Sequence, residues 1–172
     1  MNKYLKLIIF LIFISITFHM CKNRNDNNSN SKNQETDTNS IVENKKLNVE
    51  DYDFAIMENR NFIQYNKAIY QRGDEVYFVL KNVGEFVKGA DSLNNAEMKL
   101  EVYDAIGQLV MTRSNLFGSS GHANFENNIL KAPYASYSSS KNDKIGKYSI
   151  KVTVYDIIKN DSISISDDFF LE

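Results

Sequence analysis

Few side chains in this chain of 172 residues could do chemistry, and their spacing does not bring them together. His122 is the only histidine after His19, and it lies in a Gly/Ser loop without a cysteine or a second histidine nearby. A zinc site or a Ser-His pair needs partner groups held at a defined geometry. There is no G-x-S-x-G motif and no phosphate-binding glycine loop. We therefore predict a non-catalytic protein without metal or cofactor, in which His122 is a solvated loop residue or part of a binding loop.

Aspartates are the next candidates. Asp104 and Asp156 each end a Val-Tyr-Asp triplet where a strand-like run meets a turn. An aspartate at such a position usually accepts hydrogen bonds from its own turn. A calcium site, which we keep as an alternative, would need about six oxygen ligands gathered together. The contributors to such a site would be Asp74, Asp91, Asp161, Asp167 and Asp168, although no loop has the D-x-D-x-D spacing.

Tyr134 and Tyr137 are the residues best suited to binding. They follow Pro133 and precede a run of three serines, within the stretch 132–143 that we expect to be irregular. Tyrosine offers a large contact area at a low entropic cost, so the pair could form a rigid aromatic platform. The alternative is that both rings pack against the edge of the fold and hold a long loop in place. Function would then be sought on three loops, 85–95, 117–123 and 132–143.

The elements that must position these residues are strands. Residues 146–156 alternate between apolar and polar side chains, which is the period of a strand with one buried face. Further strands are expected at 75–81, 97–104, 108–112 and 162–166, with a weak one at 124–130. A bulge or bend is expected near Asp167, because two acids interrupt the alternation there. No segment has the spacing of a helix, so the pattern predicts an all-β sandwich or barrel.

The runs 70–78, 102–107 and 146–156 resemble successive strands of immunoglobulin-like sandwich modules in bacterial envelope proteins. Tyr148, which follows Gly146 and Lys147, resembles the corner tyrosine whose hydroxyl bonds to a nearby backbone group. The resemblance implies an immunoglobulin-like antiparallel β-sandwich over residues 47–172. It does not assign a function, because such modules do many jobs.

The first residues resemble a bacterial lipoprotein signal. Lys3 and Lys6 precede an apolar run at 7–18, and Cys21, the only cysteine, is followed by a polar stretch. The run is shorter than the roughly 20 residues of a spanning helix. The resemblance implies cleavage after residue 20 and acylation of Cys21; Lys22 gives no signal for inner-membrane retention, so the outer membrane or cell surface is expected. The alternatives are an uncleaved anchor helix and a soluble secreted form.

Residues 22–46 are dominated by polar side chains, and none of residues 23–39 is apolar. Such a segment cannot bury enough surface to offset its conformational entropy, so a disordered tether is predicted. The net charge of −2, without a basic block, argues against nucleic acid as a partner. We predict a tethered envelope module that binds an envelope protein, a peptide or a glycan. The alternative is a passive structural or accessory module without a ligand of its own.

Overall fold

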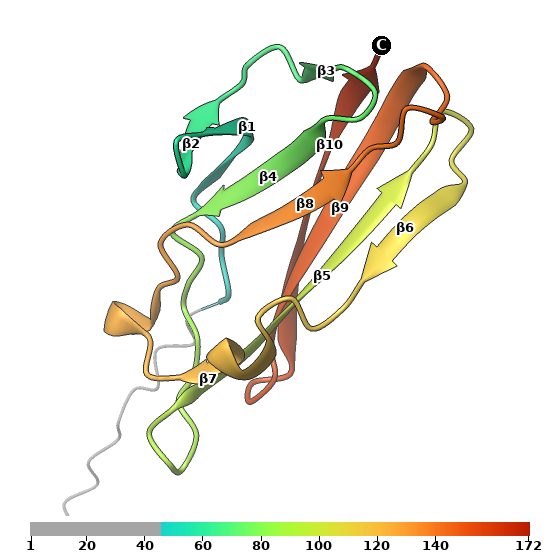
Figure 1. The fold of residues 1–172 in the computed structure, drawn as a ribbon. Helices are drawn as coiled ribbons and strands as arrows, with labels where there is room; N and C mark the ends of the chain where they lie inside the picture. Colours follow the sequence, from blue (N-terminus) through green and yellow to red (C-terminus); the bar gives the residue numbers. More distant parts are fainter. Residues whose placement is uncertain (1–45) are drawn as a thin grey trace, which may run out of the picture. The chain divides into compact units, whose positions relative to one another are not determined.

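The computed structural model describes residues 46–172, which form two facing β-sheets (Figure 1). In spatial order, the four-stranded sheet contains β2 (Asn61–Gln64), β1 (Asp51–Glu58), β4 (Glu75–Lys81) and β8 (Tyr134–Ser138). The six-stranded sheet contains β3 (Ile69–Tyr70), β10 (Asp161–Leu171), β9 (Gly146–Asp156), β5 (Asn94–Tyr103) and β6 (Leu109–Arg113), with β7 (His122–Ala123) paired to β5. Between these strands, all ladders are antiparallel except that of β3 with β10. The predicted all-β, immunoglobulin-like antiparallel β-sandwich is therefore confirmed.

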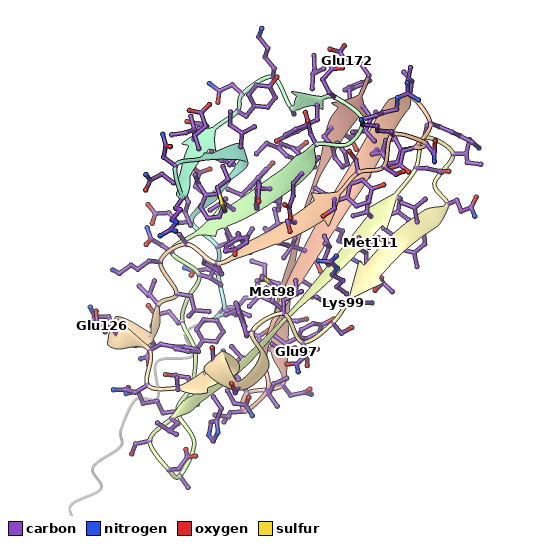
Figure 2. All side chains as sticks on the ribbon, in the orientation of Figure 1. Glu97, Met98, Lys99, Met111, Glu126 and Glu172 are labelled. Atoms are coloured by element: carbon purple, nitrogen blue, oxygen red, sulfur yellow. The ribbon has the colours of Figure 1, made fainter. Side chains whose placement is uncertain are left out.

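β9 occupies the place predicted for a central strand, between β10 and β5. Its Ile150, Val152 and Val154 are fully buried, as the alternation indicated. The same period is visible in β5, where Met98 is 1% exposed and the next residue, Lys99, lies on the opposite face (Figure 2). Because successive side chains of a strand point to opposite faces, each strand contributes one row to the shared interior.

Aromatic rings fill the interior at the end where β3 pairs with β10. The centroid of Phe54 on β1 lies 5.2 Å from that of Phe78 on β4 and 6.0 Å from that of Phe169 on β10. Phe169 also stacks on Tyr148 of β9, at 5.6 Å. Tilted and edge contacts at these distances are favourable beyond the area they bury. These rings join the two sheets, since they come from both.

Tyr148 is a corner tyrosine, as the sequence resemblance implied. Its ring is 4% exposed, and its hydroxyl donates a hydrogen bond of 2.9 Å to the backbone carbonyl of Lys144. The residue enters the strand just after Gly146, whose φ of 145° places it among the backbone conformations that L side chains rarely adopt. The hydroxyl therefore fixes the path of the chain as it enters β9.

The prediction of a bulge near Asp167 was wrong, because the strand pairs regularly there. β10 pairs with β9 without a shift over eleven residue pairs, from Asp161 opposite Asp156 to Leu171 opposite Gly146. Asp167 lies on the inward-facing row, in step with the buried Phe169. Asp167 fits there because it lies beside the hydroxyl of Tyr52. The pKa of Tyr52 is raised mainly by burial and then by the charge of Asp167. Two consecutive acids thus continue the alternation.

Two further expectations were wrong. The stretch 132–143 contains β8, so it is not irregular throughout. Residues 124–130 form no strand: they contain the short 3-10 turn η3 (Glu126–Asn128), in which Asn127 and Asn128 have φ values of 51° and 57°. Asparagine tolerates this left-handed region better than most residues, and such backbone cannot continue a strand. A second such turn, η2 (Gly118–Gly121), lies in the stretch 117–123.

The predictions for residues 1–45, including the signal segment, Cys21 and nearly all of the tether, fall outside the described residues. Within residues 46–172, no helix is long and apolar enough to cross a membrane.

Candidate binding surface

Tyr134 and Tyr137 lie on opposite faces of β8, because they are an odd number of residues apart on one strand. Tyr137 is 6% exposed, with its ring 6.0 Å from that of Phe169 and its hydroxyl donating a 2.7 Å hydrogen bond to Asp143 Oδ2. Tyr134 is 46% exposed on the outer face. The two rings therefore do not share one platform: Tyr137 packs in the core, and Tyr134 is available to a partner.

Tyr134 belongs instead to a cluster on the outer face of the four-stranded sheet. Its ring centroid lies 4.8 Å from that of Phe62 on β2 and 6.0 Å from that of Tyr77 on β4, and those two are 5.3 Å apart. We call these three residues the aromatic cluster. Ala55 and Val79 lie on the same face, opposite Tyr77 and Tyr134 in the ladders, and are only 1% and 7% exposed. The aromatic cluster thus shields this part of the sheet and holds Tyr134 in a fixed position.

Charged groups on this face lie on both sides of the aromatic cluster along β4, at Lys81 and at Glu75. Lys81 Nζ lies 2.9 Å from Asp51 Oδ2 and 2.5 Å from Asp53 Oδ2. The hydrogen bond from Lys81 holds the pKa of the Asp51 carboxyl below the usual range. Within the cluster, the Tyr77 hydroxyl donates to Glu75 Oε2 at 3.0 Å, and burial first and this bond second raise the pKa of Tyr77. Tyr77 therefore stays neutral, and the rings present an uncharged surface.

A cleft of about 380 Å³ runs beside Tyr134, along the edge of β8. Its lining combines the residues at the start of β8 with others from β5, β6 and the segment that follows β6. The lining residues are Met98, Arg113, Leu116, Phe117, Ala132, Pro133, Tyr134, Ala135 and Ser136. The cleft therefore opens between the edge strands of the two sheets, next to the aromatic cluster.

His122 lies elsewhere. It is on β7, and its ladder with Asn94 and Asn95 of β5 ties two of the predicted binding loops, 85–95 and 117–123, to each other. Its Nε2 lies 2.9 Å from Asp91 Oδ2, and both side chains are about half exposed. The pKa of Asp91 is held below the usual range, mainly by the hydrogen bond from the N–H of Leu93 and then by the one from His122. His122 does not line the cleft, so the structure does not bring it together with Tyr134.

The two Val-Tyr-Asp aspartates accept hydrogen bonds from their own turns, as predicted. Asp104 Oδ1 accepts from the N–H groups of Ile106 and Gln108, at 3.1 and 2.9 Å. Asp156 is 1% exposed, and its Oδ1 accepts from the N–H groups of Ile158 and Lys159, both at 3.1 Å.

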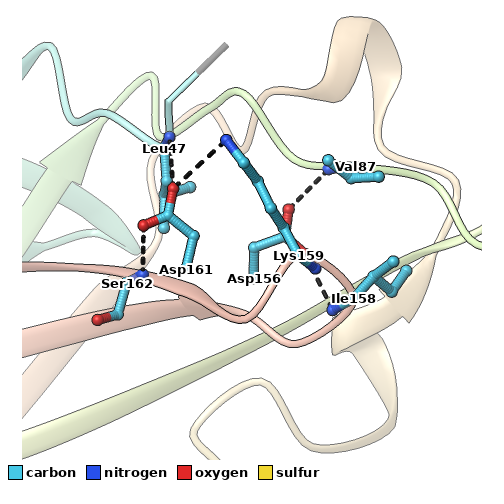
Figure 3. Close-up of polar contacts among 7 residues, drawn as sticks. All are labelled: Leu47, Val87, Asp156, Ile158, Lys159, Asp161 and Ser162. Atoms are coloured by element: carbon cyan, nitrogen blue, oxygen red, sulfur yellow. Dashed lines mark hydrogen bonds and ion pairs between the residues drawn. The ribbon is translucent and has the colours of Figure 1, made fainter. Parts of the chain in front are cut away.

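Asp156 also reaches beyond its turn. Its Oδ2 accepts a 2.7 Å bond from Val87 N–H, as Figure 3 shows. Nearby, Asp161 accepts bonds from the N–H groups of Leu47 and Ser162. Burial raises the pKa of Asp161, but these donors outweigh it and the net shift is downward. The two carboxylates thus fasten the β9–β10 turn to the loop after β4 and to the start of the fold.

The aspartates considered for calcium do not gather at one site, although Asp161, Asp167 and Asp168 all lie on β10. Asp74 accepts a 2.9 Å bond from Gln71 N–H before β4, while Asp168 pairs with Lys147 Nζ at 2.9 Å and accepts a bond from the Ser149 hydroxyl. Over residues 46–172, no three carboxylate, histidine or cysteine groups lie close enough to share a metal ion.

Sequence reasoning missed three residues of this surface: Phe62, Tyr77 and Arg113. In the sequence, Phe62 lies in a run without a clear period, and Tyr77 lies in a continuous apolar run. A signal was present in Tyr77, which stands on the outward row of a strand whose other row, with Val76 and Phe78, is fully buried. An aromatic residue on the outward row of a strand indicates a second contact surface.

No protein-family model matches the chain, and no curated protein matches it. Solved structures do match, among them the C-terminal domain of wzt, with a TM-score of 0.45 and 11% identity over 73% of each chain. A likeness that distant carries no information on ligand or partner. Residues 46–172 form a β-sandwich domain.

Proposed function

We propose that this protein is a lipid-anchored protein of the bacterial cell envelope whose β-sandwich binds a protein, peptide or glycan partner without catalysing a reaction. The anchoring part rests on Lys3, Lys6, the apolar run at 7–18 and Cys21. The binding part rests on one observation: Tyr134 is 46% exposed within the aromatic cluster and borders the cleft beside β8.

The physical reason is preorganisation. Phe62 and Tyr77 already restrict the Tyr134 ring, so a partner that contacts it loses little further side-chain entropy. A rigid aromatic residue beside a concave surface is the usual composition of a binding site. Mutually supporting rings on the wet face of a sheet favour a binding role over a passive one.

The test is retention of envelope components by the full-length protein, purified in detergent and immobilised. Solubilised envelope proteins and envelope glycans are applied separately to wild type and to Tyr134→Ala. We expect a retained component whose amount falls at least tenfold with Tyr134→Ala. Tyr155→Ala is the matched control, because Tyr155 is a partly exposed tyrosine on the six-stranded sheet.

Stability measurements separate binding from folding. Tyr134→Ala removes a half-exposed ring and should cost about 1 kcal/mol or less. Tyr137→Ala removes a buried ring and should cost about 3 kcal/mol or more. If nothing is retained above background, or if Tyr134→Ala and Tyr155→Ala behave alike, the passive structural module is the better account.

A further inference from the structure

The outer edge of β8 carries backbone groups without a strand beside them. The N–H of Leu80 donates to the carbonyl of Pro133 at 2.9 Å, and that of Asn82 donates to Lys131 at 3.0 Å. Antiparallel ladders alternate, so the residues between bonded positions direct both backbone groups to the other side. Tyr134 and Ser136 therefore point their N–H and C=O groups away from β4. Within residues 46–172, β4 is the only strand in the ladder with β8.

β8 also lacks the features that normally protect an edge. Edge strands usually carry a lysine, another charge, a proline or a bulge that discourages pairing with another chain. The strand reads Tyr-Ala-Ser-Tyr-Ser, without a charge, and its ladder with β4 has no register shift. The nearest proline, Pro133, precedes the strand and faces β4 through its carbonyl. The edge is therefore open to a further strand over Tyr134 and Ser136.

The cleft lies where such a strand would lie, because Tyr134 and Ser136 are both among its lining residues. Met98, Leu116 and Phe117 supply an apolar floor for side chains. Arg113 is the only charged lining residue, and no carboxylate lines the cleft. None of the ion pairs among the described residues involves Arg113. By charge complementarity, an occupant should bring an acidic group to this guanidinium.

We propose that the free edge of β8 binds an extended peptide segment as an added antiparallel or parallel strand, with a carboxylate of that segment beside Arg113. This rests on the proposed function and names the class of partner. The main chain of the peptide bonds to the backbone of Tyr134 and Ser136, and its alternate side chains enter the cleft. The volume of about 380 Å³ lies within the range of ligand sites, roughly 300–1,000 Å³.

A peptide strand fits these groups better than a glycan does. Tyr134 and Ser136 are two residues apart, so their free donor and acceptor groups repeat about every 7 Å along the edge. A polypeptide strand presents complementary groups at that repeat, with an N–H and a C=O together at each position. Sugar hydroxyls have no such fixed register.

The test is selection of displayed random octapeptides with free C termini on the full-length protein in detergent, followed by fluorescence anisotropy with resynthesised peptides. We expect the enriched peptides to share an acidic side chain, or to lose binding when their C-terminal carboxylate is amidated. Ser136→Pro should weaken binding at least tenfold, because it removes an outward N–H and blocks the edge, whereas Ser136→Ala keeps the backbone and should bind as wild type does. Arg113→Gln should weaken binding threefold or more and reduce its salt dependence.

N-methylated peptides make the test independent of the folding of Ser136→Pro. Methylating the amides at alternate positions should abolish binding for one set, which faces β8, and leave the other set nearly unaffected. Failure to enrich any peptide overturns the proposal, as does equal tolerance of both methylated sets.

Two other occupants are distinguished by parallel measurements. A dimer detected by light scattering in wild type without peptide, and lost in Ser136→Pro, would replace the peptide by a second copy of this chain. Binding of a uronic-acid oligosaccharide that Ser136→Pro abolishes, without any enriched peptide, would assign the cleft to a glycan. In either case, Tyr134-dependent retention of an envelope component leaves the broader proposed function standing.

Discussion

At the scale of single residues, tyrosine hydroxyls determine much of the fold. Tyr148 fixes the entry to β9 through its hydrogen bond to the carbonyl of Lys144. Tyr70, which is 2% exposed, donates a 3.2 Å hydrogen bond from its hydroxyl to the carbonyl of Ala55. Tyr148 was predictable because a corner tyrosine leaves a local signal, a glycine followed by the start of an alternating strand. The role of Tyr70 was not, since its acceptor is 15 residues away on another strand.

Tyr148→Phe tests the corner. The ring and its packing remain, but the Lys144 carbonyl loses its donor. We expect a loss of about 1 kcal/mol in the free energy of unfolding, measured by urea denaturation. Tyr155→Phe is the control, because Tyr155 lies partly exposed on the outward row of the same strand. Equal effects of the two substitutions would contradict the assignment.

Buried tyrosines also predict a dependence on alkaline pH. Burial first raises the pKa of Tyr70, with smaller effects from Tyr65 and Asp74; burial and then the bond to Asp143 raise that of Tyr137. Below pH about 10, folded and unfolded states both keep these protons. Above it, the unfolded tyrosines lose theirs first, so the free energy of unfolding should fall as pH rises.

We expect this decline in urea titrations between about pH 10 and pH 12, with a slope of up to about 1.4 kcal/mol per pH unit for each buried tyrosine. Tyr70→Phe should make the slope shallower, whatever its effect on stability at neutral pH. An unchanged slope in that variant would show that Tyr70 titrates normally in the fold.

At the scale of elements, turns and edges were harder to predict than strand interiors. The runs at 75–81 and 146–156 coincide with β4 and β9, because burial of one or both faces leaves a periodic pattern. β8 was hidden, since serine and alanine give little hydrophobic contrast on an edge strand. Its existence depends on hydrogen bonds to β4, nearly 60 residues earlier, which no local pattern records.

The two Val-Tyr-Asp turns allow a matched comparison. Asp156→Ala leaves the N–H groups of Val87, Ile158 and Lys159 without their acceptor at a site that is 1% exposed, so we expect a loss of about 2 kcal/mol or more. Asp104→Ala affects only its own exposed turn and should cost about 1 kcal/mol or less. Thermal melts of both variants check which one loses more stability. A larger loss in Asp104→Ala than in Asp156→Ala would refute the role of Asp156 in fastening the β9–β10 turn to the loop after β4.

At the scale of the whole molecule, the candidate binding surface could not be foreseen because it is assembled from distant segments. Phe62, Tyr77 and Tyr134 come from three strands, and the cleft adds Arg113 from the other sheet. The sequence predicted the sandwich that brings them together and one member of the set, Tyr134. It could not supply the neighbours of that residue, since they follow from strand order and register.

The anchoring proposal belongs to this scale as well. If Cys21 carries acyl chains, each buried methylene contributes about 0.8 kcal/mol, and several chains hold the protein on a membrane. Cys21→Ser should therefore move the protein from the membrane to the soluble fraction after cell lysis, while Tyr134-dependent binding persists. Mass spectrometry of the N-terminal peptide is the direct measurement. An unmodified Cys21, or a mature chain that still begins at Met1, would refute acylation.

The eleven-pair ladder of β9 with β10 bears on how the molecule comes together. Its two strands are joined by a turn of four residues, so the chain closes this ladder at little entropic cost. β4 and β8 must close a loop of more than 50 residues to meet. The β9–β10 hairpin should thus form early, and within the smaller sheet β8 should dock after β2, β1 and β4 have paired. The strand that completes the smaller sheet last is also the one whose outer side stays available in the finished protein.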